Sequence, residues 1–174
     1  MTEVTPIAAG WARSLGGGAA GASPAGLAAG RVPLKSGMLS DDLGDLEAVH
    51  FVGVRCRDCG TTLLLRRARC ENCSSKNLSD ESFASSGVVH TFTIQRYPPP
   101  PPHIGPTPWV PRPVAWIDLD NGPRIMGPIA ARADELQIGM RVTAEFVVGW
   151  RDELGREVVS FQFRPERALA QESR

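Results

Sequence analysis

The 174-residue chain is long enough for one ordinary domain or two small ones, and too short for a barrel enzyme of about 250 residues. Its 18 glycines and 15 prolines are too many for an all-helical protein, so strands and loops should dominate. Nineteen basic and nineteen acidic residues balance, which removes any bulk attraction to phosphate backbones. No apolar run of about 18 residues predicts a membrane span, and no secretory signal is evident, so we expect a cytoplasmic protein.

The N-terminal part of the chain predicts an arm with little structure of its own. Residues 1–36 are mostly Ala, Gly, Ser and Pro, which bury too little apolar surface to offset their ordering entropy. Trp11 and Leu15, four residues apart, leave open a short docking helix within this otherwise flexible stretch. From Ser40 to Val49, a capping serine, early acidic residues and apolar residues three apart predict a short helix.

Four cysteines fall in two Cys-x-x-Cys pairs separated by ten residues: Cys56, Cys59, Cys70 and Cys73. Each pair fits a tight turn that aims both sulfurs at one point, and four thiolates can enclose Zn²⁺ in a tetrahedron. Gly60 suits the first turn because glycine tolerates a positive φ. The pattern predicts a structural zinc ribbon, since a closed four-sulfur site has no open position for substrate. Zinc binding would supply the folding free energy of the ribbon, which is roughly 10 to 16 kcal/mol in zinc-finger peptides.

Two other uses of the cysteines are disfavoured. Two disulfides would require an oxidising compartment, and no export signal is evident. A redox Cys-x-x-Cys would need only one pair, and no βαβ unit surrounds either pair.

Basic residues gather around the cysteines, and three of them lie between the two pairs: Arg66, Arg67 and Arg69. One interpretation is that they offset the negative charge of a zinc–thiolate centre. The other is that they bind phosphate, because the arginine fork matches phosphate oxygens.

The second half of the chain alternates with period two and predicts strands at 87–94, 114–119, 124–129, 142–150 and 159–163. In the first of them, Val88, His90, Phe92 and Ile94 are predicted to share one face. Residues 131–137 are compatible with a short helix between the third and fourth strands. This order matches a five-stranded OB-fold barrel better than a sandwich of seven or more strands.

A proline-rich loop from Tyr97 to Pro113 joins the first two strands and contains five consecutive prolines. Proline has no backbone donor, so the loop should project as a stiff segment instead of joining a sheet. It carries Ile104, Trp109 and Val110, which we predict to contact a partner protein. Folding back onto the barrel is the alternative for these side chains.

No catalytic constellation is recognisable. The chain has no nucleophile elbow, no Walker loop and no paired carboxylate motif. His90 falls on a strand and His103 lies in the proline-rich loop, and neither has an evident catalytic partner. We therefore expect no catalysis by this chain alone.

Taken together, these pieces resemble the DUF35 family of zinc-ribbon and OB-fold proteins over about residues 49 to 166. The resemblance rests on the four-cysteine ribbon followed in order by Gly87 to Thr93, Pro113 to Arg124, Ile138 to Val142 and Phe161 to Pro165. It implies a non-catalytic subunit in a hetero-oligomer with a thiolase-fold enzyme that acts on coenzyme A thioesters. The catalytic groups would belong to the partner, and the ribbon arginines would help to hold the coenzyme.

The sequence thus predicts a mainly β protein with four parts: an arm with a short helix at 1–48, a zinc ribbon at 49–82, an OB-fold barrel at 83–166 and a tail at 167–174. The partner reaction is expected to be thiolytic cleavage or acyl transfer, and a thiolase-like retro-aldolase of sterol side-chain degradation is an alternative. Nucleic-acid binding ranks lower because of the balanced charge. An independent hydrolase or lyase ranks lowest because no general base is evident.

Overall fold

A computed structural model describes residues 30–100 and 107–166 of the protein. The predictions for Trp11, Leu15, Ile104 and the tail at 167–174 lie outside these residues. Strands dominate the described part: β1 (Arg31–Pro33), β2 (Phe51–Cys56), β3 (Thr62–Leu64), β4 (Leu78–Phe83), β5 (Ser86–Gln95), β6 (Arg112–Leu119), β7 (Arg124–Pro128), β8 (Arg141–Arg151) and β9 (Glu157–Pro165). The predicted helix at 131–137 is a single 3-10 turn, Ala133–Glu135. Within the described ranges, no helix has the length and apolar character needed to cross a bilayer.

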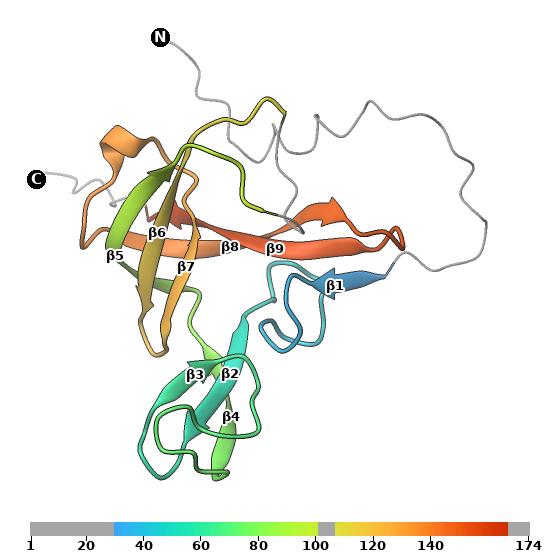
Figure 1. The fold of residues 1–174 in the computed structure, drawn as a ribbon, viewed down its shortest axis with the longest axis vertical. Helices are drawn as coiled ribbons and strands as arrows, with labels where there is room; N and C mark the ends of the chain where they lie inside the picture. Colours follow the sequence, from blue (N-terminus) through green and yellow to red (C-terminus); the bar gives the residue numbers. More distant parts are fainter. Residues whose placement is uncertain (1–29, 101–106, 167–174) are drawn as a thin grey trace, which may run out of the picture.

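The predicted OB-fold barrel is confirmed. One sheet has the strand order β1-β9-β8-β5-β6-β7, and all neighbours from β9 to β7 are antiparallel (Figure 1). A parallel bridge between Ile129 and Phe163 links the end of β7 back to β9, and the Ala130 N–H donates to the Phe163 carbonyl at 2.7 Å. This link closes strands β5 to β9 into a five-stranded barrel.

A β-bulge in β5 overturns one predicted strand face. The pairing of β5 with β6 shifts register between Val89 and Thr91. Val89 therefore points into the core, whereas His90 is exposed. The bulge forms where Val89 exchanges backbone hydrogen bonds with Gly139 and Met140, just before β8. Because the extra residue reverses the alternation, His90 does not share a face with Phe92.

The ribbon is a three-stranded antiparallel sheet, in the order β3-β2-β4, that forms a separate lobe below the barrel in Figure 1. Its first residue, Phe51, is fully buried within the barrel core. The Phe51 ring lies 5.1 Å from Phe146, 5.0 Å from Phe161 and 6.4 Å from Phe163, measured between centroids. The strand that leads into the metal region is thus anchored in the barrel by an aromatic cluster.

The segment before the ribbon differs from both predictions made for it. Arg31–Pro33, within the stretch predicted to be flexible, pairs in parallel with the edge strand β9. No helix forms from Ser40 to Val49; this stretch consists of bends and turns. The side chains of Asp42 and Asp45 accept hydrogen bonds from backbone N–H groups two residues onward, at 2.8 and 3.0 Å. Such local hydrogen bonds compete with helix formation. The apolar residues of the segment nevertheless pack on the core.

The turn after β6 holds the linker between ribbon and barrel. Asn121 accepts a hydrogen bond from the backbone N–H of Ala84 at 2.6 Å and donates to the Ser82 carbonyl at 3.4 Å. A β-carbon at Gly122 would lie 2.7 Å from the Phe83 ring, so only glycine lets the turn approach this closely. The orientation of the ribbon is therefore fixed where its chain enters and leaves, because Phe51 and Phe83 pair at the barrel end of the sheet.

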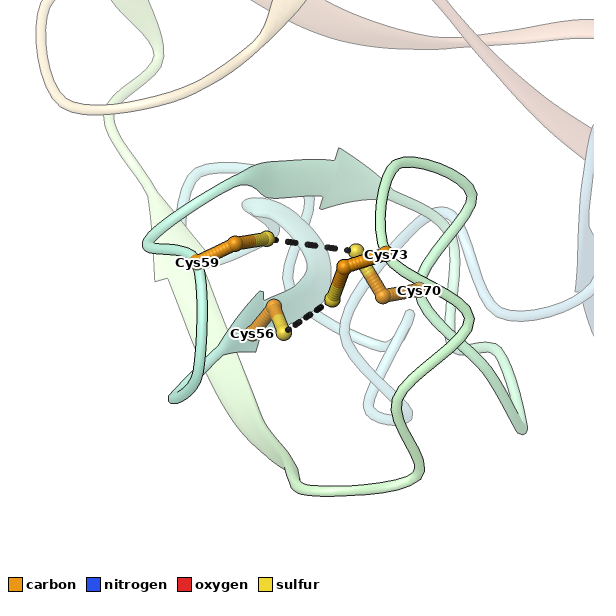
Figure 2. A group of neighbouring side chains, drawn as sticks. All are labelled: Cys56, Cys59, Cys70 and Cys73. Carbon is orange, nitrogen blue, oxygen red and sulfur yellow. Dashed lines mark hydrogen bonds between the residues drawn. The ribbon is translucent and has the colours of Figure 1, made fainter.

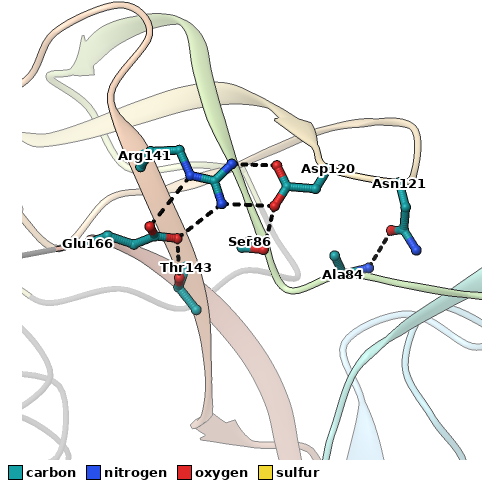
Figure 3. Close-up of polar contacts among 7 residues, drawn as sticks. All are labelled: Ala84, Ser86, Asp120, Asn121, Arg141, Thr143 and Glu166. Atoms are coloured by element: carbon teal, nitrogen blue, oxygen red, sulfur yellow. Dashed lines mark hydrogen bonds and ion pairs between the residues drawn. The ribbon is translucent and has the colours of Figure 1, made fainter.

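Beside this turn, a charged network joins strands from across the barrel. Figure 3 shows the Arg141 guanidinium between Asp120 and Glu166. Ser86 also donates to Asp120, at 2.6 Å, and Thr143 donates to Glu166 at 3.0 Å. These hydrogen bonds tie β5, β8 and the turn after β6 to the residue that follows β9.

The network predicts a loss of stability in acid. Arg141 and then Ser86 lower the pKa of Asp120 to about 2, below an unfolded-state value of about 3.9. A depressed pKa adds stability that is fully present above about pH 4 and disappears as the pH falls towards 2. We expect the urea midpoint of the native protein to exceed that of Asp120→Asn at about pH 5, with the difference shrinking towards pH 2. The four cysteines are the same in both proteins, so a difference in urea midpoint that does not vary with pH would contradict this role for Asp120.

Candidate metal centre

The four cysteine sulfurs converge on one point. Two loops, one from each Cys-x-x-Cys pair, face each other across the site (Figure 2). The Sγ atoms of Cys56 and Cys73 lie 3.5 Å apart, those of Cys59 and Cys70 lie 3.6 Å apart, and all four lie within 4.8 Å of one another. A Zn–S bond of about 2.3 Å places tetrahedral ligands about 3.8 Å apart. The donors and their spacing therefore fit a tetrahedral zinc ion, and no disulfide joins any of these cysteines.

The two cysteine loops repeat one backbone geometry. The Gly60 N–H donates to the Cys56 carbonyl, and the Ser74 N–H donates to the Cys70 carbonyl, both at 2.9 Å. The residue after each pair is left-handed, with φ of 75° at Gly60 and 61° at Ser74. This confirms the positive φ predicted for Gly60. Each loop thus presents two sulfurs on the same side of a tight turn.

The first loop gives a test of backbone conformation alone. A β-carbon at Gly60 would meet no atom within 4 Å, so Gly60→Ala changes only the ease of adopting a positive φ. We expect a loss of about 1 to 2 kcal/mol in the free energy of unfolding, measured by urea denaturation with zinc present. Ser74→Ala is the matched control, because position 74 already carries a β-carbon, and it should change stability much less. Equal losses in the two variants would refute the argument.

The electrostatics of the sulfur cluster favour a bound cation. Hydrogen bonds from the side chain and backbone of Thr61 lower the pKa of Cys59 to about 6. The Ser75 N–H lowers the pKa of Cys73, but the three neighbouring sulfurs, together with desolvation, outweigh it and raise that pKa to about 12. Four thiolates this close repel one another, and a divalent cation at their centre relieves the repulsion.

A polar bridge that the sequence did not reveal supports the two loops. Asp58, between the first two cysteines, accepts hydrogen bonds from Ser75 and from the Asn77 side chain, the latter at 2.7 Å. These bonds lower the pKa of Asp58. In the sequence Asp58 is only an acidic residue between two cysteines, so its partner seventeen residues onward could not be inferred.

The three ribbon arginines all have acceptors on the protein itself. Arg66 forms a two-pronged ion pair with Asp41, at 2.9 and 3.2 Å, and so links the ribbon to the preceding segment. Arg67 pairs with Glu71, four residues onward, and Arg69 donates to a backbone carbonyl in the second cysteine loop at 3.3 Å. Both functions considered for them, charge compensation and phosphate binding, remain predictions.

The described part of the proline-rich loop folds back at its aromatic residue. Trp109 is half-buried, its indole N–H donates to the Gln95 carbonyl at 3.2 Å, and Arg112 lies over its ring at 5.0 Å. Val110, the next residue, is 62% exposed. Among the predicted interface residues, Trp109 thus lies against the barrel and Val110 faces solvent, while Ile104 lies outside the described residues. The partner interface remains a prediction.

An exposed apolar pair lies on the outer face of the barrel. Trp116 on β6 is directly opposite Met126 on β7, and they are 44% and 54% exposed. Beside them, Asp118 forms an ion pair with Arg124, and His90 contacts both side chains at 3.1 and 2.9 Å. The alternating pattern placed Trp116 in a strand but did not indicate which face it occupies.

Both lobes match models of known protein families. Residues 47–79 match "ChsH2, rubredoxin-like zinc ribbon domain", and residues 82–147 match "ChsH2, C-terminal OB-fold domain". The first match covers all four cysteines, and the second begins at the end of β4.

Similar proteins are known from two archaea, and both are described as "DUF35 domain-containing scaffold protein". That of Methanocaldococcus jannaschii is 32% identical over 105 residues, covering 58% of this chain and 70% of the relative. That of Pyrococcus furiosus is 31% identical over 123 residues, covering 68% of this chain and 85% of the relative. A solved chain described as "Ltp2-ChsH2(DUF35) aldolase" is 25% identical with a TM-score of 0.49, covering 67% of this chain and 84% of that one. On the strength of its sequence relatives and its two domains, the chain belongs to the DUF35 family.

Proposed function

We propose that this protein is a non-catalytic scaffold subunit that docks on a thiolase-fold enzyme acting on acyl-CoA thioesters. One structural Zn²⁺, held by Cys56, Cys59, Cys70 and Cys73, would keep the ribbon folded. The observation that carries the proposal is the closed four-sulfur cluster, because it leaves a metal no open position for substrate. The two archaeal relatives described as scaffold proteins support the same assignment.

No second candidate metal site competes with the cysteines in the described part of the chain. Across residues 30–100 and 107–166, the cysteines are the only group of three or more His, Cys, Asp or Glu side chains placed to hold a metal. His90 lies on an exposed surface against an Asp–Arg ion pair. Catalytic groups would then come from the partner. The reaction, thiolytic cleavage or acyl transfer, follows from the family resemblance, and a retro-aldol cleavage is the alternative.

Coenzyme A would contact the ribbon through Arg66, Arg67 and Arg69. Phosphate oxygens would replace the exposed carboxylates of Asp41 and Glu71, since exposed ion pairs contribute little stability. In the assembled complex, Arg67→Gln and Arg69→Gln should each raise the KM for acyl-CoA with little change in kcat. An unchanged KM would contradict a coenzyme A contact, and the arginines would then serve to offset the negative charge of the zinc–thiolate centre.

Co-purification tests the docking. The tagged chain, expressed with candidate thiolase-fold enzymes, should capture one of them in a defined stoichiometry. Val110→Asp should weaken the complex about tenfold or more, because burying an unpaired carboxylate in an interface is costly. Leu154→Asp is the matched control, since Leu154 is an exposed leucine in the turn between β8 and β9, outside the proline-rich loop. Failure to capture any thiolase-fold protein would overturn the proposal.

One observation favours a second function, nucleic-acid binding. OB-fold proteins stack bases on exposed aromatic side chains, and Trp116 is such a side chain on the second barrel strand. If this function is correct, single-stranded RNA or DNA should bind at physiological salt and Trp116→Ala should weaken binding. The balanced charge of the chain places this function below the scaffold.

A further inference from the structure

Each of the two cysteine loops exposes one cysteine and buries the other. In both Cys-x-x-Cys pairs the first cysteine is buried, since Cys56 is 0% and Cys70 is 2% exposed, whereas the second, Cys59 or Cys73, is exposed. A small oxidant in solvent therefore reaches one cysteine of each loop before the other. This difference decides the order of oxidation, because oxidation follows thiolate character and access.

Each exposed sulfur lies against the buried sulfur of the opposite loop. Figure 2 shows both contacts: the Sγ atoms of Cys73 and Cys56 are 3.5 Å apart, and those of Cys59 and Cys70 are 3.6 Å apart. A disulfide bond is about 2.0 Å long, so each pair of sulfur atoms has to approach by only about 1.5 Å. The fold thus places a second cysteine within reach of each one that an oxidant meets first.

Hydrogen peroxide is an oxidant that can convert such a pair into a disulfide. The exposed thiolate attacks the O–O bond and takes up one oxygen as a sulfenic acid, while the other oxygen leaves as hydroxide and is protonated to water. The buried thiolate then attacks the sulfenic sulfur, so an S–S bond forms, the S–O bond breaks and a second water leaves. Two thiolates, one peroxide and two protons thus give one disulfide and two waters. A disulfide sulfur carries no charge with which to hold Zn²⁺, so oxidation of both pairs frees the metal.

We propose that the sulfur cluster is a peroxide-sensitive switch: each exposed cysteine is oxidised first and forms a disulfide with the buried cysteine of the opposite loop, and zinc is released from the ribbon. The two disulfides join Cys56 to Cys73 and Cys59 to Cys70. The proposal rests on the zinc site of the proposed function, but it does not depend on the partner enzyme. Without the metal the ribbon loses its source of folding free energy. The disulfides keep the two loops together, so reduction and fresh zinc should restore the site.

Zinc release from the full-length, zinc-loaded chain tests the switch. The zinc content is first measured by elemental analysis, and hydrogen peroxide is then added with a chromogenic zinc indicator present. The chain should release its zinc with two peroxide molecules consumed for each ion, and dithiothreitol with added Zn²⁺ should restore the bound metal. A chain that holds zinc and keeps it in excess peroxide would overturn the switch alone. A chain that holds no zinc before oxidation would overturn the metal site and the switch together.

Peptide mapping of the oxidised chain identifies the disulfides without any substitution. Digestion with trypsin and Glu-C cuts inside each Cys-x-x-Cys pair, after Arg57 and after Glu71, and trypsin also cuts between the pairs, so each cysteine lies on its own peptide. After free thiols are blocked with N-ethylmaleimide, mass spectrometry should find only the two linkages across the loops that Figure 2 joins. Any other pairing, or cysteines oxidised to sulfonic acids without disulfides, would overturn the proposal.

Met126→Leu is the matched control for oxidation elsewhere in the chain. Met126 is an exposed methionine on the barrel, and peroxide oxidises methionine as well as cysteine. The variant should release zinc at the rate of the native protein. Release that is slowed several-fold in Met126→Leu would assign the effect to methionine oxidation and overturn the role of the cysteines.

Discussion

Replacement of Cys70 by serine is expected to abolish zinc binding and unfold the ribbon. Cys70 is 2% exposed and its sulfur lies 3.6 Å from that of Cys59, so its loss removes one wall of the tetrahedron. A serine hydroxyl does not replace a thiolate as a zinc ligand. Zinc supplies roughly 10 to 16 kcal/mol in small metal-dependent domains, more than a lobe of this size gains from its own core.

Elemental analysis and amide NMR dispersion measure this effect. Cys70→Ser should contain less than one zinc per chain, and the dispersed amide signals of β2, β3 and β4 should collapse. Ser74→Ala changes a residue of the same loop that is not a sulfur donor, and it should keep both metal and dispersion. A dispersed, metal-free ribbon in Cys70→Ser would show that the sulfur cluster is not what folds this lobe.

Truncation of Phe51 to alanine should cost about 3 to 5 kcal/mol of unfolding free energy, the usual range for a fully buried aromatic ring. The ring is 0% exposed and packs against three barrel phenylalanines, although its backbone begins the ribbon. Its loss opens a cavity at the junction and should loosen the ribbon relative to the barrel. Zinc should remain bound, because no cysteine is affected.

Urea denaturation gives the free energy, and NMR relaxation reports whether the two lobes tumble together. Phe51→Leu, which retains most of the buried volume, should cost less than about 1.5 kcal/mol and keep common tumbling. If Phe51→Ala costs less than about 1 kcal/mol, or if the lobes still tumble as one body, this ring does not couple the ribbon to the barrel.

The ribbon and the barrel were both predictable because their signals are local. Two Cys-x-x-Cys pairs at a spacing of ten residues set the sulfur geometry almost independently of the rest of the chain. The four strands predicted between Val114 and Phe163 are confirmed: three are longer by one or two residues at an end, and β7 stops one residue early, at Pro128. The alternation predicted for the third of them, β8, breaks at a register shift between Val148 and Trp150. In both cases each short segment carries enough information for its own conformation.

The features missed from sequence depend on residues far apart in the chain. The bulge at His90 forms because Val89 bonds to the segment before β8, some fifty residues onward. β1 exists because β9 offers an edge for a parallel strand. Neither partner is visible to an argument about local periodicity. The helix predicted from Ser40 was wrong for a local reason, since aspartate side chains there cap turns.

The same distinction applies to the candidate site. Spacing indicated the four sulfurs, whereas the Asp58 bridge and the Arg66–Asp41 pair depend on how distant loops meet. The inward position of Trp109 depends on the Gln95 carbonyl, which the two strands flanking the proline-rich loop bring within reach. Residue type alone suggested a projecting anchor, and tertiary contacts placed this side chain on the barrel.

Native mass spectrometry of the chain purified with its partner tests the scaffold assignment most directly. The proposal predicts an intact complex that contains a thiolase-fold enzyme and one zinc ion for each copy of this chain. Removal of the metal by a chelator should unfold the ribbon and with it the proposed coenzyme A contact of Arg66, Arg67 and Arg69. A chain that carries no zinc and forms no complex, or that turns over an acyl-CoA by itself, would contradict the assignment.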